Sequence, residues 1–331
     1  MKEFFARLAP LRWPLPGLAA VVLVLAIANQ ILQSSAPGLA LNTYTTLVLA
    51  TIGINIILCV SLNLVNGFMG EFSVGHAGFM ALGAYASAVV TVKWLPALVS
   101  SFWLFPVAVV FGGIVAGLIG FLLGLLSFKT RGDYLAIITL AFLMIVKSAI
   151  ENIPYLGGPR GMTPPALTTL PWVAFWVIFT LWIIRNLVYS KFGRGVIAIR
   201  EDEIAANSMG VRTREAKLIA FVVSSFFGGI AGALYAHVNY FIDPKSFDIV
   251  KSTEILVMVY LGGIGSIAGS VLGAIIFTYL SQLLLDLGTW RMVILSAILV
   301  LLMLFRPRGI MGLKELPWFL PIRELFKRRK P

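Results

Sequence analysis

The sequence is poor in charge and almost free of cysteine. Of its 331 residues, 12% are charged and 59% are hydrophobic, whereas a soluble domain carries about a quarter charged residues. No charged residue occurs between Arg12 and Glu71. About 20 apolar residues suffice to span a bilayer, so this composition excludes a soluble globular enzyme. The single cysteine, Cys59, also excludes a disulfide scaffold.

The residues and motifs of common catalytic sites are scarce as well. Two histidines, His76 and His237, cannot build an ordinary zinc site without several carboxylates. The sequence contains neither the Gly-x-Ser-x-Gly nucleophile motif nor the Gly-x4-Gly-Lys-Ser/Thr phosphate loop. We therefore expect no catalytic residue, no metal site and no cofactor of the chain's own. A membrane-embedded enzyme would need a clustered catalytic set, for which acids and histidines are too sparse.

The basic residues that give the net charge of +12 are unevenly distributed. Twenty of the 26 lie before the first apolar run, at Lys129 and Arg131, between Arg185 and Lys217, or after Phe305. Basic loops mark the cytoplasmic side of polytopic membrane proteins. We interpret the charge as a topology signal with both termini cytoplasmic, and not as a nucleic-acid surface.

Continuous apolar runs predict an all-α polytopic membrane protein with nine or ten transmembrane segments. The chain is expected to form one transmembrane domain over 1–331, with a cytoplasmic coupling loop at 190–217 and a basic cytoplasmic tail at 306–331. The runs lie at 16–32, 43–64, 72–92, 101–128, 134–150, 171–188, 218–240, 254–261, 267–285 and 292–305.

Two glycine-rich breaks interrupt the apolar runs, one at 66–70 and one at 262–266. Non-helical backbone at membrane depth is tolerated where it is buried or lines a watery cavity, as in transporters. The alternative is close helix packing through small residues. The breaks resemble each other and define a candidate parallel repeat. The candidate pathway residues are Gly70, Glu71, Ser73, Gly75, His76, Gly262, Gly263 and Gly265.

Glu71 and His76 are the ionisable residues at the first break. Glu71 is either a solvated carboxylate at the start of a helix or a pathway residue. His76 is either a hydrogen-bonded structural histidine or a group that titrates near neutral pH. Both alternatives stay open from the residues alone.

The longest polar stretch is 190–217, and its part 195–217 mixes charge with apolar residues at helical spacing. Ile197, Ile204, Ala205 and Met209 form an expected apolar stripe, and Gly210 supplies a helix stop. Such a short helix can fit a cytoplasmic partner protein or rest on lipid. The sequence pattern favours neither.

Several segments, in order over 63–312, resemble the membrane permease subunits of branched-chain amino-acid ABC importers, in particular the LivM-like branch. They are GFMGEFSVGHAGFMALGAYASA (67–88), RGDYLAIITLAF (131–142), LGGPRGM (156–162), AIREDEIAANSMGV (198–211), KLIAFVVSSFFGGIAGALYA (217–236), GGIGSIAGSVLGA (262–274) and FRPRGIMG (305–312). Each is glycine-rich and weak alone, but the ordered set is specific.

The resemblance implies that the polar segment holds the cytoplasmic coupling helix, whose Glu-Ala-Ala…Gly pattern falls on Glu203, Ala205, Ala206 and Gly210. It also implies a second related permease, two cytoplasmic ATP-binding subunits that bind ATP and magnesium, and an extracytoplasmic solute-binding protein. The location implied is a bacterial or archaeal cytoplasmic membrane.

Two residues depart from the family pattern. Glu71 stands where an uncharged residue is more common, and Lys147 stands where arginine is frequent, so bidentate geometry is lost. Relatives of this branch also move urea, short amides or other amino acids. The rival from another class is an ion-coupled secondary transporter that uses Glu71 as its coupling carboxylate.

Overall fold

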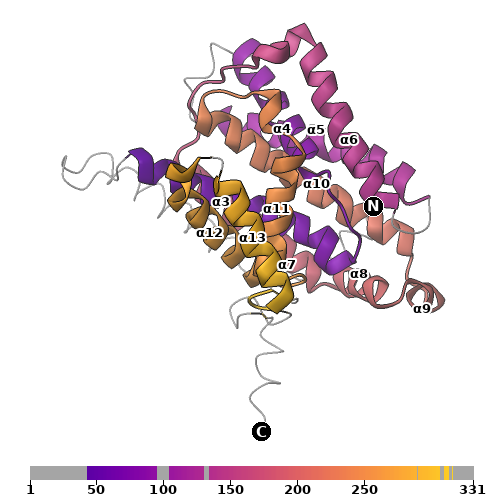
Figure 1. Ribbon diagram of the computed structural model, residues 1–331. Coiled ribbons are helices and arrows are strands. Elements are labelled where there is room, and N and C mark those ends of the chain that lie inside the picture. Colours follow the sequence, from indigo (N-terminus) through magenta and orange to yellow (C-terminus); the bar gives the residue numbers. More distant parts are fainter. Residues whose placement is uncertain are drawn as a thin grey trace.

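The computed structural model describes residues 43–94, 104–129, 134–288, 290–305, 309–312 and 315. Over these residues the protein is built from helices, with one isolated backbone bridge between Met162 and Ile242. The all-α prediction is therefore confirmed (Figure 1). The longer helices are α3 (Thr43–Asn63), α4 (His76–Val89), α5 (Leu104–Ser127), α6 (Tyr134–Asn152), α7 (Leu170–Val188), α8 (Lys191–Glu201), α10 (Thr213–Asn239), α11 (Ile249–Gly262), α12 (Ile267–Leu283) and α13 (Trp290–Phe305).

The described part of the chain has six helices long and apolar enough to cross a membrane. They begin within α3, α4, α5, α6, α7 and α10, while α12 is a shorter apolar helix. The predicted spans at 254–261, 267–285 and 292–305 correspond to α11, α12 and α13, which have 14, 17 and 16 residues. The predicted first span, 16–32, lies outside the described residues.

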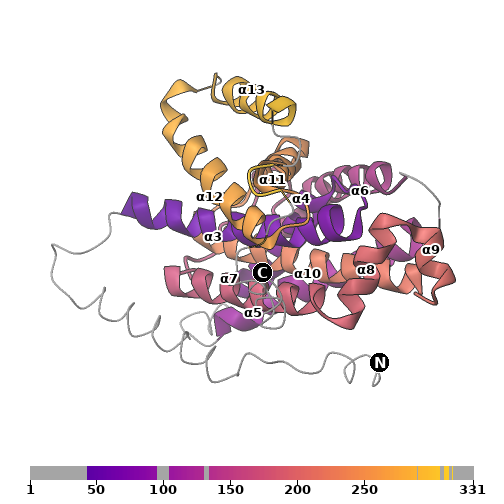
Figure 2. The same cartoon turned by 90° about the horizontal axis from the view of Figure 1, so that it is seen from below.

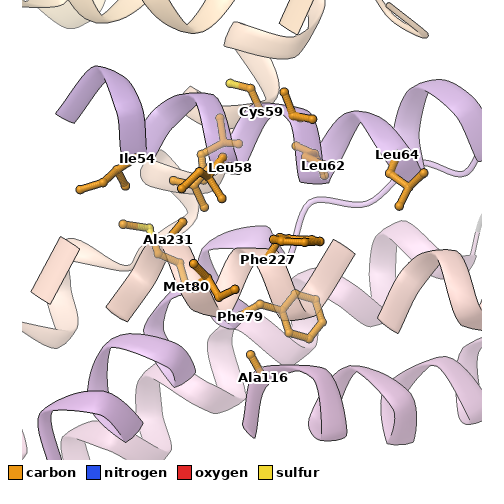
Figure 3. Close-up of a cluster of buried hydrophobic side chains, with 14 of the residues drawn as sticks. Ile54, Leu58, Cys59, Leu62, Leu64, Phe79, Met80, Ala116, Phe227 and Ala231 are labelled. Carbon is orange, nitrogen blue, oxygen red and sulfur yellow. The ribbon is translucent and has the colours of Figure 1, made fainter. Parts of the chain in front are cut away.

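Helices α3, α4 and α10 form the centre of the fold. The chain itself buries 78%, 72% and 67% of their most apolar stretches, against 33–39% for α5, α6 and α7. Figure 3 shows the shared core, to which α3 contributes Leu58, α4 contributes Phe79 and Met80, and α10 contributes Phe227. A helix that is apolar on its core-facing side and also on its outward side suits a bundle whose outer surface meets lipid.

Helices α4 and α10 approach each other closely because glycines face one another. A Cβ placed on Gly83 would lie 2.0 Å from the carbonyl oxygen of Gly229, and one placed on Gly232 would lie 1.9 Å from that of Met80. Small residues allow such backbone contact in membrane proteins, where helices associate through packing. Glycine therefore permits close helix packing at these positions, which lie outside the two breaks.

The short helices α8 and α9 (Glu203–Ser208) lie at one extremity of the fold. Figures 1 and 2 both place α9 beyond α8, away from α12 and α13. Helix α9 is joined to the centre of the bundle through α10, which begins at Thr213. The last five residues of the segment 190–217 belong to α10.

Candidate transport pathway and coupling segment

The first glycine break is longer than the sequence indicates. Helix α3 continues as a π-helical turn, Leu64–Met69, which ends at Gly70 with a left-handed φ of 79°. Residues 71–75 have no helical structure, and α4 begins at His76. The prediction that the helix resumes near Phe72 was therefore wrong. A side-chain-bearing residue rarely adopts the conformation that Gly70 requires.

The polar contacts of the break explain why the helix resumes late. The Asn66 side chain accepts a hydrogen bond from the backbone N–H of Ser73 at 3.2 Å and donates to its carbonyl at 3.3 Å. The N–H of Val74 donates to Thr139 Oγ1 of α6 at 3.2 Å. These side chains satisfy backbone groups that a helix would otherwise pair internally. Gly75 packs against the same residue, since a Cβ there would lie 2.3 Å from the Thr139 carbonyl oxygen.

The second break separates α11 from α12. Helix α11 ends at Gly262, Gly263 and Gly265 both have positive φ, and Ser266 caps α12 by accepting a hydrogen bond from Gly269 N–H at 3.0 Å. The predicted break, 262–266, begins one residue too early, because Gly262 is the last residue of α11, and its end is correct. Gly262 and Gly263 are buried, and Gly265 is partly buried.

Asn63, the last residue of α3, connects the two breaks. Its fully buried side chain donates to the Ser266 carbonyl at 2.9 Å and to Ser270 Oγ at 2.7 Å, and it accepts from Gly265 N–H at 2.9 Å. Gly67 lies beside it, since a Cβ there would meet the Gly265 nitrogen at 2.5 Å. Asn63 and Gly67 thus bring the two breaks into contact.

The segment after α13 covers the second break. The N–H groups of Ile310 and Met311 donate to the carbonyls of Leu261 and Gly262 at 2.9 and 3.0 Å. The Glu315 carboxylate accepts from the N–H groups of Ile267 and Ala268 at 2.5 and 3.3 Å, at the start of α12. These described residues of the predicted tail are therefore attached to the bundle.

We expect Glu315 to make stability depend on pH. Burial raises the pKa of its carboxyl group above the ordinary value, and the two backbone N–H groups only partly offset this effect. The folded protein then holds the proton more tightly than the unfolded chain, so the stabilisation is complete below the unfolded pKa and is lost as pH rises through the folded pKa. Thermal unfolding in detergent between pH 4 and 8 should show this loss, and the neutral variant Glu315→Gln should lack that part of it. An identical pH profile for both proteins would contradict the assignment.

His76 is a structural residue in this arrangement. The residue is 2% exposed, and Nε2 lies 2.9 Å from Ser61 Oγ of α3. Ser224 of α10 donates to the Ser61 carbonyl at 2.6 Å. The three side chains join α3, α4 and α10 through polar contacts, so of the two alternatives for His76 the hydrogen-bonded one describes this structure.

The polar segment 190–217 forms two helices before α10. Helix α8 is capped by Ser190, and α9 by Asp202, whose Oδ1 accepts from the N–H groups of Ile204 and Ala205 at 2.8 and 3.0 Å. Asp202 has extended backbone and breaks the helix. The prediction of one continuous apolar stripe was therefore wrong, because Ile197 lies on α8 whereas Ile204 and Met209 are 81% and 85% exposed.

Helix α9 presents the residues that the resemblance singles out. Glu203 and Ala205 are exposed, and Ala206 is buried. Gly210 follows α9 with φ of 84°, and a Cβ there would meet no neighbouring atom within 4 Å. Gly210 is thus needed for its backbone conformation and not for close packing, which agrees with the predicted turn.

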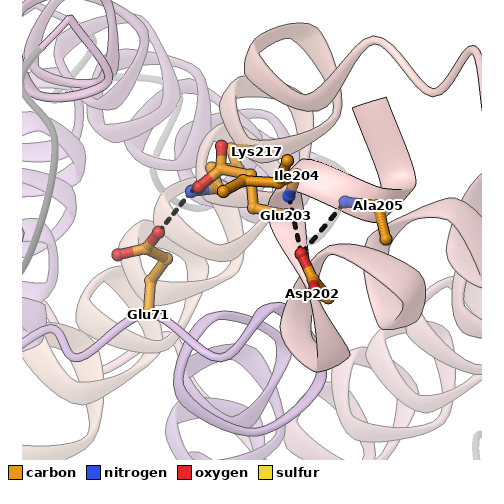
Figure 4. A network of polar contacts seen from close by, with 6 residues as sticks. All are labelled: Glu71, Asp202, Glu203, Ile204, Ala205 and Lys217. Carbon is orange, nitrogen blue, oxygen red and sulfur yellow. Dashed lines mark hydrogen bonds and ion pairs between the residues drawn. The ribbon is translucent and has the colours of Figure 1, made fainter. Parts of the chain in front are cut away.

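Lys217 of α10 joins α9 to the first break. Its ammonium group lies 2.6 Å from Glu71 Oε1 and 2.8 Å from Glu203 Oε2 (Figure 4). The side chains are 10%, 20% and 51% exposed for Lys217, Glu71 and Glu203. Glu71 lies five residues before α4, so the helix-start alternative is wrong, and its carboxylate is held by a cation.

A second cation makes a parallel connection. Arg200, near the end of α8, donates from Nη1 to the Gly67 carbonyl at 3.1 Å, within the π-helical turn. Its side chain also packs over Gly70, where a Cβ would lie 2.6 Å from Arg200 Cγ. Helix α8 is therefore bonded to the first break directly, and α9 is linked to it through Lys217.

Sequence reasoning missed three residues of this site: Asn63, Arg200 and Lys217. Asn63 is an amide at the end of an apolar run, which is a usable signal for a buried polar contact. Lys217 is the last cation before the apolar part of α10, and Glu71 is the first acid after a long uncharged stretch. Opposite charges at the ends of two membrane segments could have suggested that Glu71 and Lys217 form an ion pair. No sequence signal indicates the partner of Arg200.

Membrane-length helices around two contacting breaks, with a short exposed helix bonded to one break, define an integral membrane transport permease. The family of the branched-chain amino acid transport system permease component matches residues 44–305. The chain belongs to this family, as the sequence resemblance indicated.

Similarity to individual relatives agrees with this family membership. The chain is 34% identical over 295 residues to the high-affinity branched-chain amino acid transport system permease protein LivM of Escherichia coli (strain K12), covering 78% of this chain and 68% of the relative. It is 22% identical over 288 residues to the corresponding LivH protein of Salmonella typhimurium, covering 78% and 91%. It is 26% identical over 235 residues to a probable LivM of Methanocaldococcus jannaschii, covering 61% and 68%. No solved structure matches the chain.

Proposed function

We propose that this permease forms half of the pore of an ATP-driven importer, with α9 as the contact for the ATP-binding subunits. The observation that carries the proposal is the continuous path from α9 through Lys217 to the first break. The exposed apolar side chains of Ile204 and Met209 support a protein partner for α9. When the ATP-binding subunits move α9, Lys217 transmits the displacement to Glu71.

The other subunits follow from this role. A second related permease completes the pore, two cytoplasmic subunits bind ATP and magnesium, and an extracytoplasmic protein delivers the solute. The chain itself holds no cofactor and lies in a bacterial or archaeal cytoplasmic membrane with both termini cytoplasmic. Movement of a rigid interface helix against a packed bundle is a known way to switch between two states.

The proposed solutes are branched-chain amino acids. The matched relatives carry this solute class in their names, and LivM and LivH appear as separate permeases. Related small polar solutes, such as urea, amides or other amino acids, are the alternative within the same transporter class.

The alternative from another class is an ion-coupled carrier that uses Glu71. Its coupling carboxylate would have to exchange protons or sodium ions freely during transport. Glu71 is instead engaged by Lys217 at 2.6 Å, which favours a structural ion pair.

Uptake in proteoliposomes separates the two classes. We expect leucine uptake by the chain assembled with the second permease, the ATP-binding subunits and a liganded binding protein. This uptake should require ATP on the side of the membrane where the ATP-binding subunits lie. The chain without the ATP-binding subunits should take up no leucine under a proton or sodium gradient. Gradient-driven uptake by the chain alone, abolished by Glu71→Gln, would establish the carrier instead.

A further inference from the structure

Val74 attaches the first break to helices α6 and α11. Its N–H donates to Thr139 Oγ1 of α6 at 3.2 Å, and its carbonyl accepts a hydrogen bond from Ser252 Oγ of α11. Thr139 and Ser252 are 0% and 1% exposed. The preceding residue, Ser73, is instead bonded to Asn66 of the π-helical turn. Both helices therefore hold the break by the backbone of Val74.

The two hydroxyl groups hold Val74 in place because they are buried. Thr139 Oγ1 also donates to the Ala136 carbonyl at 3.1 Å, which sets the direction in which this oxygen accepts. A backbone group that loses its partner at a buried site costs free energy, since water does not replace the partner. A displacement of Val74 therefore either breaks these hydrogen bonds or carries α6 and α11 with it.

An ion pair joins α6 and α11 a second time. Lys147 Nζ lies 2.9 Å from Oδ2 of Asp248, which caps α11 through its other carboxylate oxygen. Thr139 lies five residues after the start of α6, and Lys147 lies five residues before its end. These two residues are therefore about 12 Å apart along α6. The two helices are thus tied together at two levels.

The connection from Val74 back to α9 is short. Glu71, which Lys217 binds at 2.6 Å, precedes Val74 by three residues. Three residues span at most about 11 Å even when they are fully extended. Lys217 in turn lies 2.8 Å from Glu203 of α9. Side-chain contacts and three residues of backbone thus connect α9 to α6 and α11.

We propose that Thr139 and Ser252 are positioning residues that pass the movement of the first break to α6 and α11, an inference that rests on the proposed importer function. When α9 displaces Glu71, Val74 follows, and its two hydrogen bonds draw α6 and α11 along. Buried hydrogen bonds and rigid helices can carry coupling between distant sites. Helix α6 is suited to this movement, because the chain buries only 33% of its most apolar stretch. The importer thus changes state by a shift of α6 and α11 against the centre formed by α3, α4 and α10.

The test removes the two hydroxyl groups and little volume. The double variant Thr139→Val, Ser252→Ala is assembled in proteoliposomes with the second permease, the ATP-binding subunits and the leucine-loaded binding protein. Leucine uptake and ATP hydrolysis are measured together. The matched control is Thr180→Val, Ser225→Ala. Thr180 and Ser225 are each 1% exposed, and their hydroxyls donate to carbonyls of their own helices, α7 and α10.

We expect the double variant to take up about fivefold less leucine per ATP hydrolysed, whereas the control variant should match the unchanged protein. Thr139→Ser keeps the hydroxyl and should match it as well. Adding Lys217→Met to the double variant should cause no loss beyond the larger of the two separate losses, because the three side chains act on one path. A defect that only loosens the bundle multiplies with the loss from Lys217→Met.

Normal leucine uptake per ATP by the double variant would overturn the proposal, and so would an equal loss in the control or multiplied losses in the triple variant. If the double variant does not assemble, Ser252→Ala alone is measured with and without Lys217→Met, and the same outcomes decide. Absence of ATP-driven leucine uptake by the unchanged complex would instead refute the proposed function.

Discussion

Replacing Lys217 by methionine should both destabilise the protein and uncouple ATP hydrolysis from transport. The substitution leaves Glu71, which is 20% exposed, without its cation. A hydrogen bond to a charged group contributes about 1.5–3 kcal/mol. The bond to Glu203 contributes less, because that side chain is 51% exposed and screened by solvent. We expect a loss of about 2–3 kcal/mol, mostly from Glu71.

A double-mutant cycle isolates the contribution of the pair. Glu71→Gln, Lys217→Met removes both charges, so it should be more stable than Lys217→Met alone, as measured by urea unfolding in detergent. Solute uptake should not recover along with stability, because both variants lack the Lys217 contact that joins α9 to the first break. In the assembled complex, both should hydrolyse ATP while transporting less solute per ATP. Full transport by the double variant would show that the connection does not carry the movement.

Replacing Asn63 by leucine should separate the two glycine breaks. Leucine has the same branched arrangement of side-chain heavy atoms but cannot make the three hydrogen bonds to Gly265, Ser266 and Ser270. The N–H group of Gly265 then loses its acceptor within a poorly hydrated site. The two donated hydrogen bonds contribute about 1 kcal/mol each, and the orphaned donor costs about 1–3 kcal/mol, so we expect a loss of about 3–5 kcal/mol.

Asn55 provides the matched control for this substitution. It lies two turns earlier in α3, is also buried, and makes one side-chain hydrogen bond, to Thr278 Oγ1 at 2.8 Å. Asn55→Leu should lower stability less than Asn63→Leu and should leave ATP-driven uptake nearly unchanged. Equal losses of uptake in both variants would mean that Asn63 serves general packing and has no special place at the breaks.

The sequence alone predicts the fold class and the positions of most helices, because apolar runs and basic loops follow from bilayer thickness and charge. It predicts the limits of α6 and α7 to within two residues. It also locates the second break, since Gly263 and Gly265 interrupt an apolar run. The sequence also predicts the turn at Gly210, because glycine tolerates the positive φ that the turn requires.

The limits of the first break and the pairing of charges could not be read from the sequence. The late start of α4 depends on Asn66 and Thr139, and the latter is more than 60 residues away from the break. The position of Glu71 depends on Lys217, which is 146 residues away. Long-range contacts of this kind leave no periodic pattern. Asp202 likewise splits α8 from α9 through its side-chain cap, which overrides the apolar spacing on either side.

Site-directed cross-linking from α9 tests the central claim most directly. Met209→Cys places a thiol on a side chain that is 85% exposed, and the native Cys59 is fully buried and does not compete. In the assembled complex, a short bifunctional reagent should link Cys at position 209 to an ATP-binding subunit, and nucleotide should change the yield. Tyr155→Cys, at an exposed position remote from α9, is the control and should give no such product. Cross-linking to the ATP-binding subunit from position 155 but not from 209 would contradict the assignment of α9 as the coupling helix.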